Sequence, residues 1–336
     1  MSTVRVLVTG ASGQDGSYLV EQLLAEGAEV HALVRPGEEP GAGVHPLPGE
    51  VHQHEGDLRD GAALEALVAE VAPTEIYNLG GLSSVALSWQ EPALTAQISG
   101  LAVGHLLQAA HDLQERSGEP VSFVQASSAE IFARTARVPQ DETTPLRPLS
   151  PYGAAKAYAH HLVGVYRAQG LRASSCVLYN HESPRRPETF VTRKITAGVA
   201  RIARGLQDEL AMGNLDARRD WGWAPDYVQA MVLAARADRG RDYVVATGVS
   251  HSVRDFVEAA FRAAGIDDWE RRVTLDQRFV RPNDAPELVG DAARARELLG
   301  WEPTVRFADV VARMVRHDLA LLDGAGDGDG AGLPER

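Results

Sequence analysis

The chain has 336 residues, of which 44% are hydrophobic, so it is long enough to bury one large core or two smaller ones. A formal net charge of -13 predicts a surface that repels nucleic acid and anionic membranes. The single cysteine, Cys176, excludes an internal disulfide, and no stretch approaches membrane-spanning length. Because the first expected strand begins almost at residue 1, we see no room for a secretory signal and expect a cytoplasmic protein.

A short apolar strand at residues 4–9 runs directly into a glycine-rich turn. Glycines at every third position let the chain turn tightly, and they let backbone N–H groups approach a pyrophosphate at the start of the next helix. The alternative is a glycine-rich turn that holds no ligand. The pattern predicts a dinucleotide site that comprises Gly10, Ser12, Gly13, Gln14, Asp15 and Gly16.

The end of the second expected strand, residues 29–34, bears on the choice of cofactor. An acid at this place holds a ribose hydroxyl, whereas a base holds a 2′-phosphate. The residue is Arg35, which favours NADP over NAD, although a solvated arginine at a loop entrance is the alternative. After the next strand, at 51–54, Asp57 is placed to accept a hydrogen bond from the adenine amino group.

Small residues follow the fourth expected strand, at 75–79. They let a cofactor cross the end of that strand. We assign further cofactor contacts to Leu58, Leu79, Gly80, Gly81 and Ser83. The alternation of strands and helices through the first half of the chain predicts an α/β fold with a doubly wound parallel (Rossmann) sheet and a smaller, mixed α/β domain for the substrate.

Tyr152 and Lys156 stand four residues apart at the start of an expected helix, so their side chains should leave one face of it. A nearby ammonium favours phenolate, which should lower the tyrosine pKa from about 10 toward neutrality. Tyr152 could then accept a proton from a sugar hydroxyl. The spacing alone is weak evidence, but the glycine-rich turn upstream strengthens it.

Together these motifs resemble the extended short-chain dehydrogenase/reductase family. Over nearly its whole length the chain is similar to one branch of that family, the GDP-mannose 4,6-dehydratases. The motifs that carry the narrower resemblance are Asn-His-Glu-Ser-Pro-Arg-Arg at 180–186, Phe-Val-Thr-Arg-Lys-Ile at 190–195 and Arg-Asp-Trp-Gly at 219–222.

The resemblance implies roles for particular residues. The catalytic set is Ser128, Glu130, Tyr152 and Lys156, and His181 and Arg186 lie against the cofactor. The residues that contact the GDP-sugar are Ser84, Asn180, Val191, Lys194, Arg219, Arg281 and Asp284. Basic clusters in an acidic protein also suit a nucleotide diphosphate, although a solvated charged face explains some of these arginines.

The implied reaction is redox-neutral dehydration of GDP-mannose to GDP-4-keto-6-deoxymannose. A hydride leaves C4, water is eliminated across C5 and C6, and the hydride returns to C6. A C4 reductase or epimerase needs Tyr152 but has no use for Glu130. Three alternatives stay open: a 4,6-dehydratase of another GDP-hexose, a GDP-hexose C4 reductase or epimerase, and a nucleotide-sugar binder without catalysis.

Several positions depart from the family pattern. Ser128 stands for threonine, Leu82 for a polar residue and Ala129 for serine. We expect the changes at Leu82 and Ala129 to alter the sugar pocket. Pro36 replaces a second arginine, so we expect only a modest preference for NADP, and Asp284 replaces a glutamate.

For the organisation of the chain we expect a cofactor domain at 1–178, to which the chain returns at about 220–250. The GDP-sugar domain then comprises 179–219 and 251–323, and 324–336 is a disordered tail rich in glycine and aspartate. The helices expected at 93–114 and from 151 carry apolar residues beyond what one sheet face needs. This predicts a homodimer, with a homotetramer as the alternative.

Overall fold

The computed structural model describes residues 4–37, 39, 41, 43–279 and 287–324, and its centre is a parallel sheet. The sheet has seven strands in the order β10-β6-β5-β4-β1-β2-β3. Chain order runs outward in both directions from β1 and β4, which is the switch point where doubly wound sheets bind ligands. The fold class predicted from the sequence is confirmed. The strands are β1 (Arg5–Thr9), β2 (Glu29–Val34), β3 (His52–Glu55), β4 (Glu75–Asn78), β5 (Ser122–Ser128), β6 (Arg172–Leu178) and β10 (Asp242–Val245).

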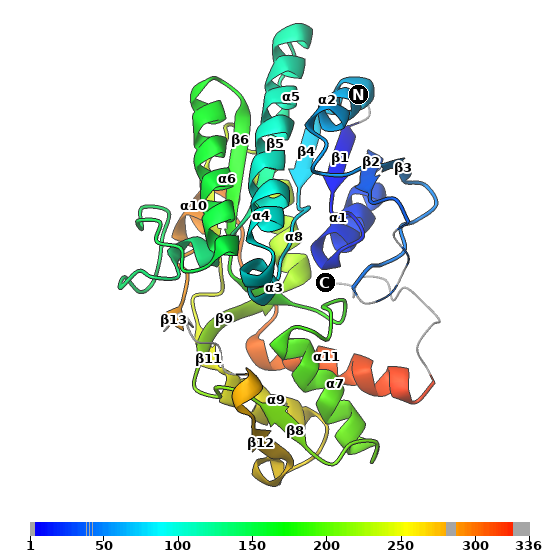
Figure 1. Cartoon of the computed structure of the whole chain (residues 1–336), viewed down its shortest axis with the longest axis vertical. Coiled ribbons are helices and arrows are strands. Elements are labelled where there is room, and N and C mark those ends of the chain that lie inside the picture. Colours follow the sequence, from blue (N-terminus) through cyan, green and yellow to red (C-terminus); the bar gives the residue numbers. More distant parts are fainter. Residues whose placement is uncertain (1–3, 38, 40, 42, 280–286, 325–336) are drawn as a thin grey trace.

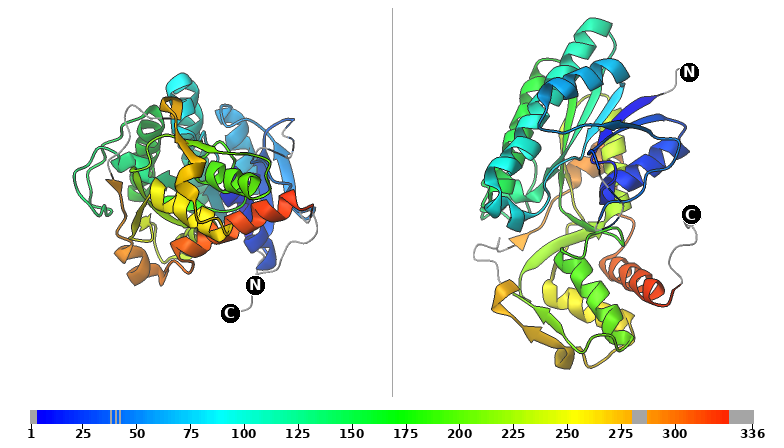
Figure 2. Two further views of the ribbon diagram at one scale, coloured as in Figure 1. Left: turned by 90° about the horizontal axis from the view of Figure 1, so that it is seen from below. Right: turned by 45° about the vertical axis from the view of Figure 1, so that its right-hand side comes forward.

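Helices cover both faces of the sheet (Figure 1, Figure 2). Their apolar stripes form two separate clusters because each face of the sheet is buried by its own layer. One layer contains α1 (Gln14–Ala25), α8 (Ala224–Arg236) and α10 (Ala293–Leu299). The other contains α2 (Gly61–Val71), α5 (Ala102–Ser117) and α6 (Pro151–Ala168).

The long helix that the sequence predicts at 93–114 is interrupted. It comprises α4 (Pro92–Ala96), a π-helical turn at Gln97–Leu101 and α5, and it follows the short helix α3 (Val85–Gln90). Wide turns of this kind occur often at functional sites. Here Ser99 within the turn accepts a hydrogen bond from the backbone N–H of Leu82 at 3.1 Å, which fixes the segment after β4.

A second apolar core lies beyond the carboxyl ends of the large sheet (Figure 1). Aromatic residues, including Trp221 and Phe256, fill it. Its helices are α7 (Val191–Ala203), α9 (Val253–Ala263) and α11 (Phe307–Leu322). The strands on this side of the molecule are β7 (Asn180–Glu182), β8 (Leu210–Met212), β9 (Arg218–Trp223), β11 (Ser250–Ser252), β12 (Val273–Leu275) and β13 (Glu287–Leu288), although Leu288 of β13 packs in the first core.

The buried carboxylate of Asp220 on β9 links the two cores. It accepts hydrogen bonds from the backbone N–H groups of Thr247 at 2.9 Å and Gly248 at 2.8 Å, just after β10. Residues 288–301 contribute to the first core, although they fall within the range 251–323 that we assign to the substrate domain. The two-domain division stays a prediction, and residues 325–336 of the expected tail lie outside the described part.

Within the described residues, no helix is both long and apolar enough to cross a membrane.

Candidate active site

The glycine-rich turn after β1 has a shape that only glycine permits. Gly10 has a φ of 69°, and a Cβ there would lie 2.8 Å from the backbone nitrogen of Gly80. A Cβ on Gly16 would lie 2.1 Å from the carbonyl oxygen of Gly10. Within the described part of the chain, no side chain caps the first turn of α1, so backbone N–H groups there can bind an anion. This cradle fits a dinucleotide pyrophosphate.

Side chains at the start of α1 hold strand β7 against the turn. Gln14 donates to the carbonyl oxygen of His181 at 3.2 Å and accepts from the Ser183 hydroxyl at 3.0 Å. The His181 ring lies 2.8 Å from an Asp15 carboxylate oxygen through Nε2 and 2.6 Å from the Tyr179 carbonyl through Nδ1. The sequence-predicted cofactor residues Gln14, Asp15 and His181 therefore lie together.

Asp15 and His181 form a buried ion pair. Burial opposes both charges, yet the neighbouring imidazolium holds the pKa of Asp15 below its usual value. Burial likewise opposes the imidazolium, but the Asp15 carboxylate holds the pKa of His181 above its usual value. Each partner therefore favours the charged form of the other near the predicted phosphate cradle.

The ends of β2 and β3 bring two arginines together, one of which the sequence reasoning missed. Arg59 donates from Nε to Asp57 at 2.9 Å and from its backbone N–H at 2.8 Å. These bonds, with a smaller contribution from Arg35, lower the pKa of Asp57 to about 2. The Asp57 carboxylate, expected to meet adenine, is thus held by Arg59. The sequence feature that could have revealed Arg59 is a basic residue two positions after an aspartate at the end of a strand.

Asp60, the neighbouring acid, caps α2. Its carboxylate accepts from the backbone N–H of Ala63 at 3.0 Å.

The segment after β4 passes close to Lys156, the predicted catalytic lysine. A Cβ on Gly80 would lie 2.7 Å from the Leu58 side chain, and one on Gly81 would lie 3.7 Å from Lys156 Nζ. Small residues here leave space beside the lysine. Ser83 is exposed, and the hydroxyl of Ser84 caps α3 by accepting from the Leu87 N–H at 3.2 Å.

A row of buried polar groups crosses the ends of β1, β4 and β5. Thr9 donates to Asn78 at 2.6 Å, and Asn78 donates to Gln125 at 2.8 Å. Gln125 and Lys156 Nζ both donate to the carbonyl oxygen of Ala126, at 2.9 and 2.8 Å. The row orients Lys156. The sequence reasoning missed Asn78 and Gln125. The feature that could have revealed each of them is a polar residue at the end of an otherwise buried strand.

The remaining catalytic candidates meet where β5 ends. Ser128 is the last strand residue, and Glu130 lies on the 3₁₀ turn at Ala129–Phe132. The Ser128 hydroxyl is hydrogen-bonded to the Tyr152 side chain and accepts from the Glu130 N–H at 3.3 Å. A Cβ on Gly153 would lie 2.7 Å from the Glu130 carbonyl oxygen, so glycine lets α6 approach this turn.

Tyr152 titrates differently from our expectation. Burial raises its pKa to about 12, and the hydrogen bond with Ser128 offsets only part of that rise. Burial also lowers the pKa of Lys156 to about 8, and its Nζ lies 5.9 Å from the Tyr152 ring centre. The predicted fall of the Tyr152 pKa toward neutrality is wrong for the chain alone, because the loss of hydration outweighs the hydrogen bond with Ser128 and the attraction of Arg186.

Arg186 faces the same centre. Its charge acts on Asp15, Tyr152 and His181, and its guanidinium stacks 4.0 Å above the Phe190 ring. Its Nε lies 3.5 Å from a Glu182 carboxylate oxygen. Arg186, expected against the cofactor, therefore lies close to both the Asp15–His181 pair and Tyr152, the predicted catalytic tyrosine.

Apart from Ser84 at the start of α3, the predicted GDP-sugar residues that the structure describes lie on β7, α7 and β9. Asn180 begins β7, and Val191 and Lys194 lie in the first turn of α7. Lys194 Nζ lies 3.1 Å above the centre of the Phe279 ring, and burial lowers the lysine pKa. Arg219 on β9 is buried and donates to the Arg218 carbonyl at 2.7 Å. Arg281 and Asp284 lie outside the described residues.

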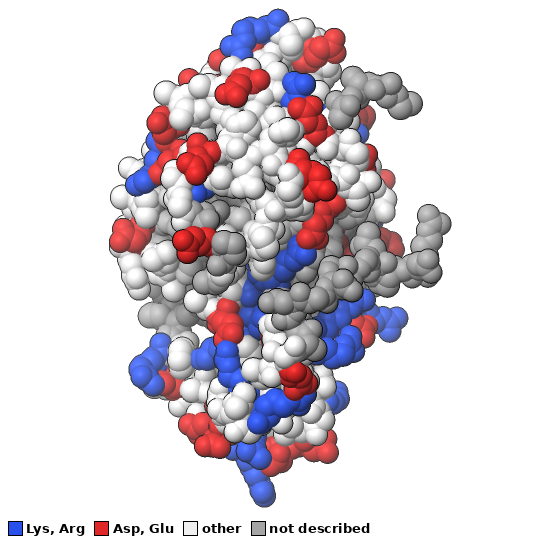
Figure 3. Space-filling model, turned by 90° about the vertical axis from the view of Figure 1, so that its right-hand side faces the viewer, with Lys and Arg blue, Asp and Glu red and all other residues white. Residues whose placement is uncertain are grey.

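Basic side chains gather over the middle and lower part of the face in Figure 3, whereas acidic ones prevail above.

The two departures expected to border the sugar differ in placement. Ala129 is buried and packs in the first core with Ile131 and Phe132, so its methyl group serves packing. Leu82 is half-buried, and its backbone is fixed by Ser99.

A doubly wound sheet with a glycine cradle and a Tyr-x-x-x-Lys pair at its switch point defines a short-chain dehydrogenase/reductase fold. The chain also matches the model for GDP-mannose 4,6 dehydratase over residues 7–314, and it belongs to that family. The predicted resemblance is confirmed.

Curated relatives and solved structures agree. The chain is 44% identical to GDP-mannose 4,6 dehydratase 1 of Arabidopsis thaliana, with 94% of this chain and 90% of the relative covered. It is 42% identical to the GDP-mannose 4,6 dehydratase of Homo sapiens, covering 94% and 91%. A structure of the UDP-glucose 4-epimerase of Thermus thermophilus with NAD superposes with a TM-score of 0.79 at 30% identity, covering 94% of this chain and 99% of that one.

Proposed function

We propose that the protein dehydrates GDP-mannose to GDP-4-keto-6-deoxymannose without net oxidation or reduction. Family membership supports the substrate. The observation that carries the reaction type is the position of Glu130, whose charge acts on the buried Tyr152 hydroxyl. A second acid-base group beside the tyrosine is what separates elimination from simple oxidation at C4.

The residues divide the chemistry between them. The C5 hydrogen of the hexose becomes acidic only when C4 is a carbonyl, so oxidation must precede elimination. A bound nicotinamide dinucleotide supplies the hydride acceptor and later the hydride donor. Tyr152 must first be deprotonated, because its pKa is about 12 in the chain alone. Its phenolate then takes the C4 hydroxyl proton while Ser128 hydrogen-bonds to it and Lys156 lies alongside. Glu130 removes the C5 proton and then gives it to the departing C6 hydroxyl, which leaves as water. When the hydride enters C6, Tyr152 returns the proton it took from the C4 hydroxyl to C5.

Mass spectrometry of a GDP-mannose incubation tests this function. We expect a product lighter by one water, formed without consumption of reduced cofactor. An isomer of unchanged mass would instead indicate an epimerase, and a dependence on added reduced cofactor would indicate a reductase. Absence of any turnover, with binding retained, would indicate a nucleotide-sugar binder.

We propose NADP as the preferred cofactor, because Arg35 and Arg59 place two guanidinium groups near Asp57 at the ends of β2 and β3. Losing one charge-assisted phosphate contact costs about 1.5 to 3 kcal/mol. Arg35→Ala and Arg59→Ala should therefore each weaken NADP+ binding roughly 10- to 100-fold and leave NAD+ binding unchanged. Titration calorimetry with each cofactor measures this.

Arg262→Ala is the matched control, because it removes an exposed arginine on α9 that pairs with Glu258. If Arg35→Ala and Arg59→Ala weaken the binding of NADP+ and of NAD+ equally, neither arginine contacts the 2′-phosphate.

We also propose a homodimer through α3, the π-helical turn and α6. Trp89, Leu101, Tyr158 and Val165 on these elements are 57%, 53%, 46% and 55% exposed, which is unusual for large apolar side chains. Light scattering should give twice the chain mass for the parent and the chain mass for a Leu101→Glu, Val165→Glu variant. Leu206→Glu, at an equally exposed position after α7, should stay dimeric. A parent monomer, or a dimer that survives both charges, would contradict this interface.

Cys176 supports a reducing compartment, and we propose the cytoplasm. It is a free cysteine buried in β6, and burial raises the pKa of its thiol to about 12. The thiol is therefore apolar filler.

A further inference from the structure

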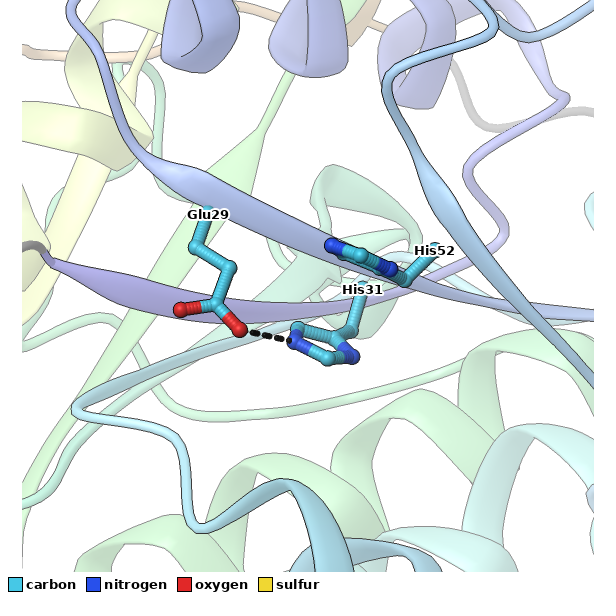
Figure 4. Close-up of side chains that lie close together, drawn as sticks. All are labelled: Glu29, His31 and His52. Carbon is cyan, nitrogen blue, oxygen red and sulfur yellow. Dashed lines mark hydrogen bonds and ion pairs between the residues drawn. The ribbon is translucent and has the colours of Figure 1, made fainter.

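The edge of the large sheet carries a group of histidines far along the chain from the catalytic residues. Glu29 and His31 lie on β2, and His52 and His54 lie on β3. His31 is the register partner of His52. Because alternate residues of a strand share a face, all four side chains lie on the same side of the sheet. Figure 4 shows Glu29, His31 and His52 side by side.

Three of these side chains place ligand atoms close together. His31 Nε2 lies 3.1 Å from Glu29 Oε1, and the His31 and His52 rings are stacked with centres 4.8 Å apart. One ligand atom from each of the three residues lies within 4.8 Å of the others. Ligand atoms around a tetrahedral zinc ion are about 3.3 Å apart, given metal–ligand bonds of about 2.0 Å. The nearly parallel rings direct their in-plane lone pairs side by side, so the two imidazoles must turn toward each other before all three residues can hold one ion.

The neighbouring groups orient these ligands. His31 Nδ1 lies 2.9 Å from His54 Nε2, so a proton on Nδ1 donated to His54 leaves the Nε2 lone pair directed toward Glu29. Arg5 holds the other Glu29 oxygen, with its Nε 3.3 Å from Oε2. His52 is exposed, so an ion can enter from solvent.

We propose that Glu29, His31 and His52 bind one divalent transition-metal ion of the zinc class, and that His54 positions His31. Two imidazoles and one carboxylate favour zinc, cobalt or nickel over magnesium or calcium, which prefer oxygen ligands. The fourth position of a tetrahedral site is open to water. The ion ties the edge strand β3 to β2 at the base of the loop that begins with Arg35, and it leaves the catalytic residues untouched.

Metal titration of the full chain tests the site without using activity. Zn2+ titration calorimetry should show one tight site per chain, and Co2+ should develop the visible absorption of a tetrahedral complex. His31→Gln and His52→Gln should each abolish both signals. His54→Gln should weaken binding about 10- to 100-fold, as for other residues that orient a ligand.

His105→Gln is the matched control. His105 also pairs with a glutamate, with Nδ1 3.0 Å from Glu65 Oε1 on α2. Binding should be unchanged in this variant, and Zn2+ should raise the melting temperature of the parent and of the control only. Because His52 is exposed, His52→Gln should melt like the parent without metal. No saturable binding by the parent, or equal binding by His52→Gln, overturns the proposal.

Discussion

Glu130→Gln is expected to lower the rate of GDP-mannose dehydration by about 10² to 10⁴, the usual contribution of a positioned general base. The amide keeps the size of the side chain but cannot take the C5 proton. Exchange of the C5 hydrogen with deuterated solvent measures this step directly. Since the Glu130 charge raises the Tyr152 pKa, the variant should also lower the Tyr152 pKa from about 12.

Two comparisons make the result specific. Glu119→Gln, at an exposed position before β5, should exchange and dehydrate at the parent rate. Equal melting temperatures for the three proteins show that the fold is intact. If Glu130→Gln still exchanges the C5 hydrogen at the parent rate, another group is the base.

Lys156→Met is expected to abolish turnover and, at neutral pH, to raise the free energy of unfolding. Burial lowers the lysine pKa from 10.5 to about 8, a shift that corresponds to about 3 kcal/mol spent on burying the ammonium. The Ala126 carbonyl keeps its hydrogen bond from Gln125 when the lysine is removed. A methionine of similar length fills the space, so we expect a net gain of about 2 kcal/mol.

The pH dependence of this difference follows from proton linkage. Between pH 8 and 10.5 the unfolded chain holds the Lys156 proton and the folded chain does not, so stability of the parent rises with pH across this window. The advantage of Lys156→Met should therefore be largest below pH 8, disappear at about pH 9.5 and reverse by about 1 kcal/mol at pH 10.5. Denaturant unfolding of both proteins from pH 7 to 10.5 measures it. If the variant is less stable than the parent at pH 7, the contacts of the Lys156 ammonium in the folded chain offset the cost of burying it.

The local sequence pattern was sufficient to predict those helices and strands whose apolar residues recur at a regular spacing. The strand before the glycine turn and the second strand at 29–34 occur where the sequence predicts them. Ser252 caps α9 through a capping box with Asp255. These features depend on neighbours within a few residues, which a single sequence displays.

The small strands of the second core could not be predicted in the same way. Strands β8, β11, β12 and β13 have two or three residues each, too few for a period of two to be visible. Strand β9 carries Arg218, Arg219 and Asp220 in a row, so it reads as a polar loop. The apolar environment supplied by α7, α9 and α11 makes these segments strands.

The same limit applies to the site. The Tyr152 and Lys156 pair and the glycine turn are visible as spacings, whereas the burial that sets their pKa values is a property of the folded chain. The Asp57 and Arg59 pairing depends on the turn after β3. His31 and His52 are separated by a long loop, and only strand pairing makes them neighbours.

Following a deuterium label from C4 of GDP-mannose tests redox-neutral dehydration most directly. In the proposed reaction the hydrogen that leaves C4 returns to C6 of the same sugar. The product should therefore be lighter by one water, retain the deuterium and carry it on C6, with no reduced cofactor added. Loss of the label to solvent or its recovery in the cofactor pool would contradict the proposed function, as would a product of unchanged mass.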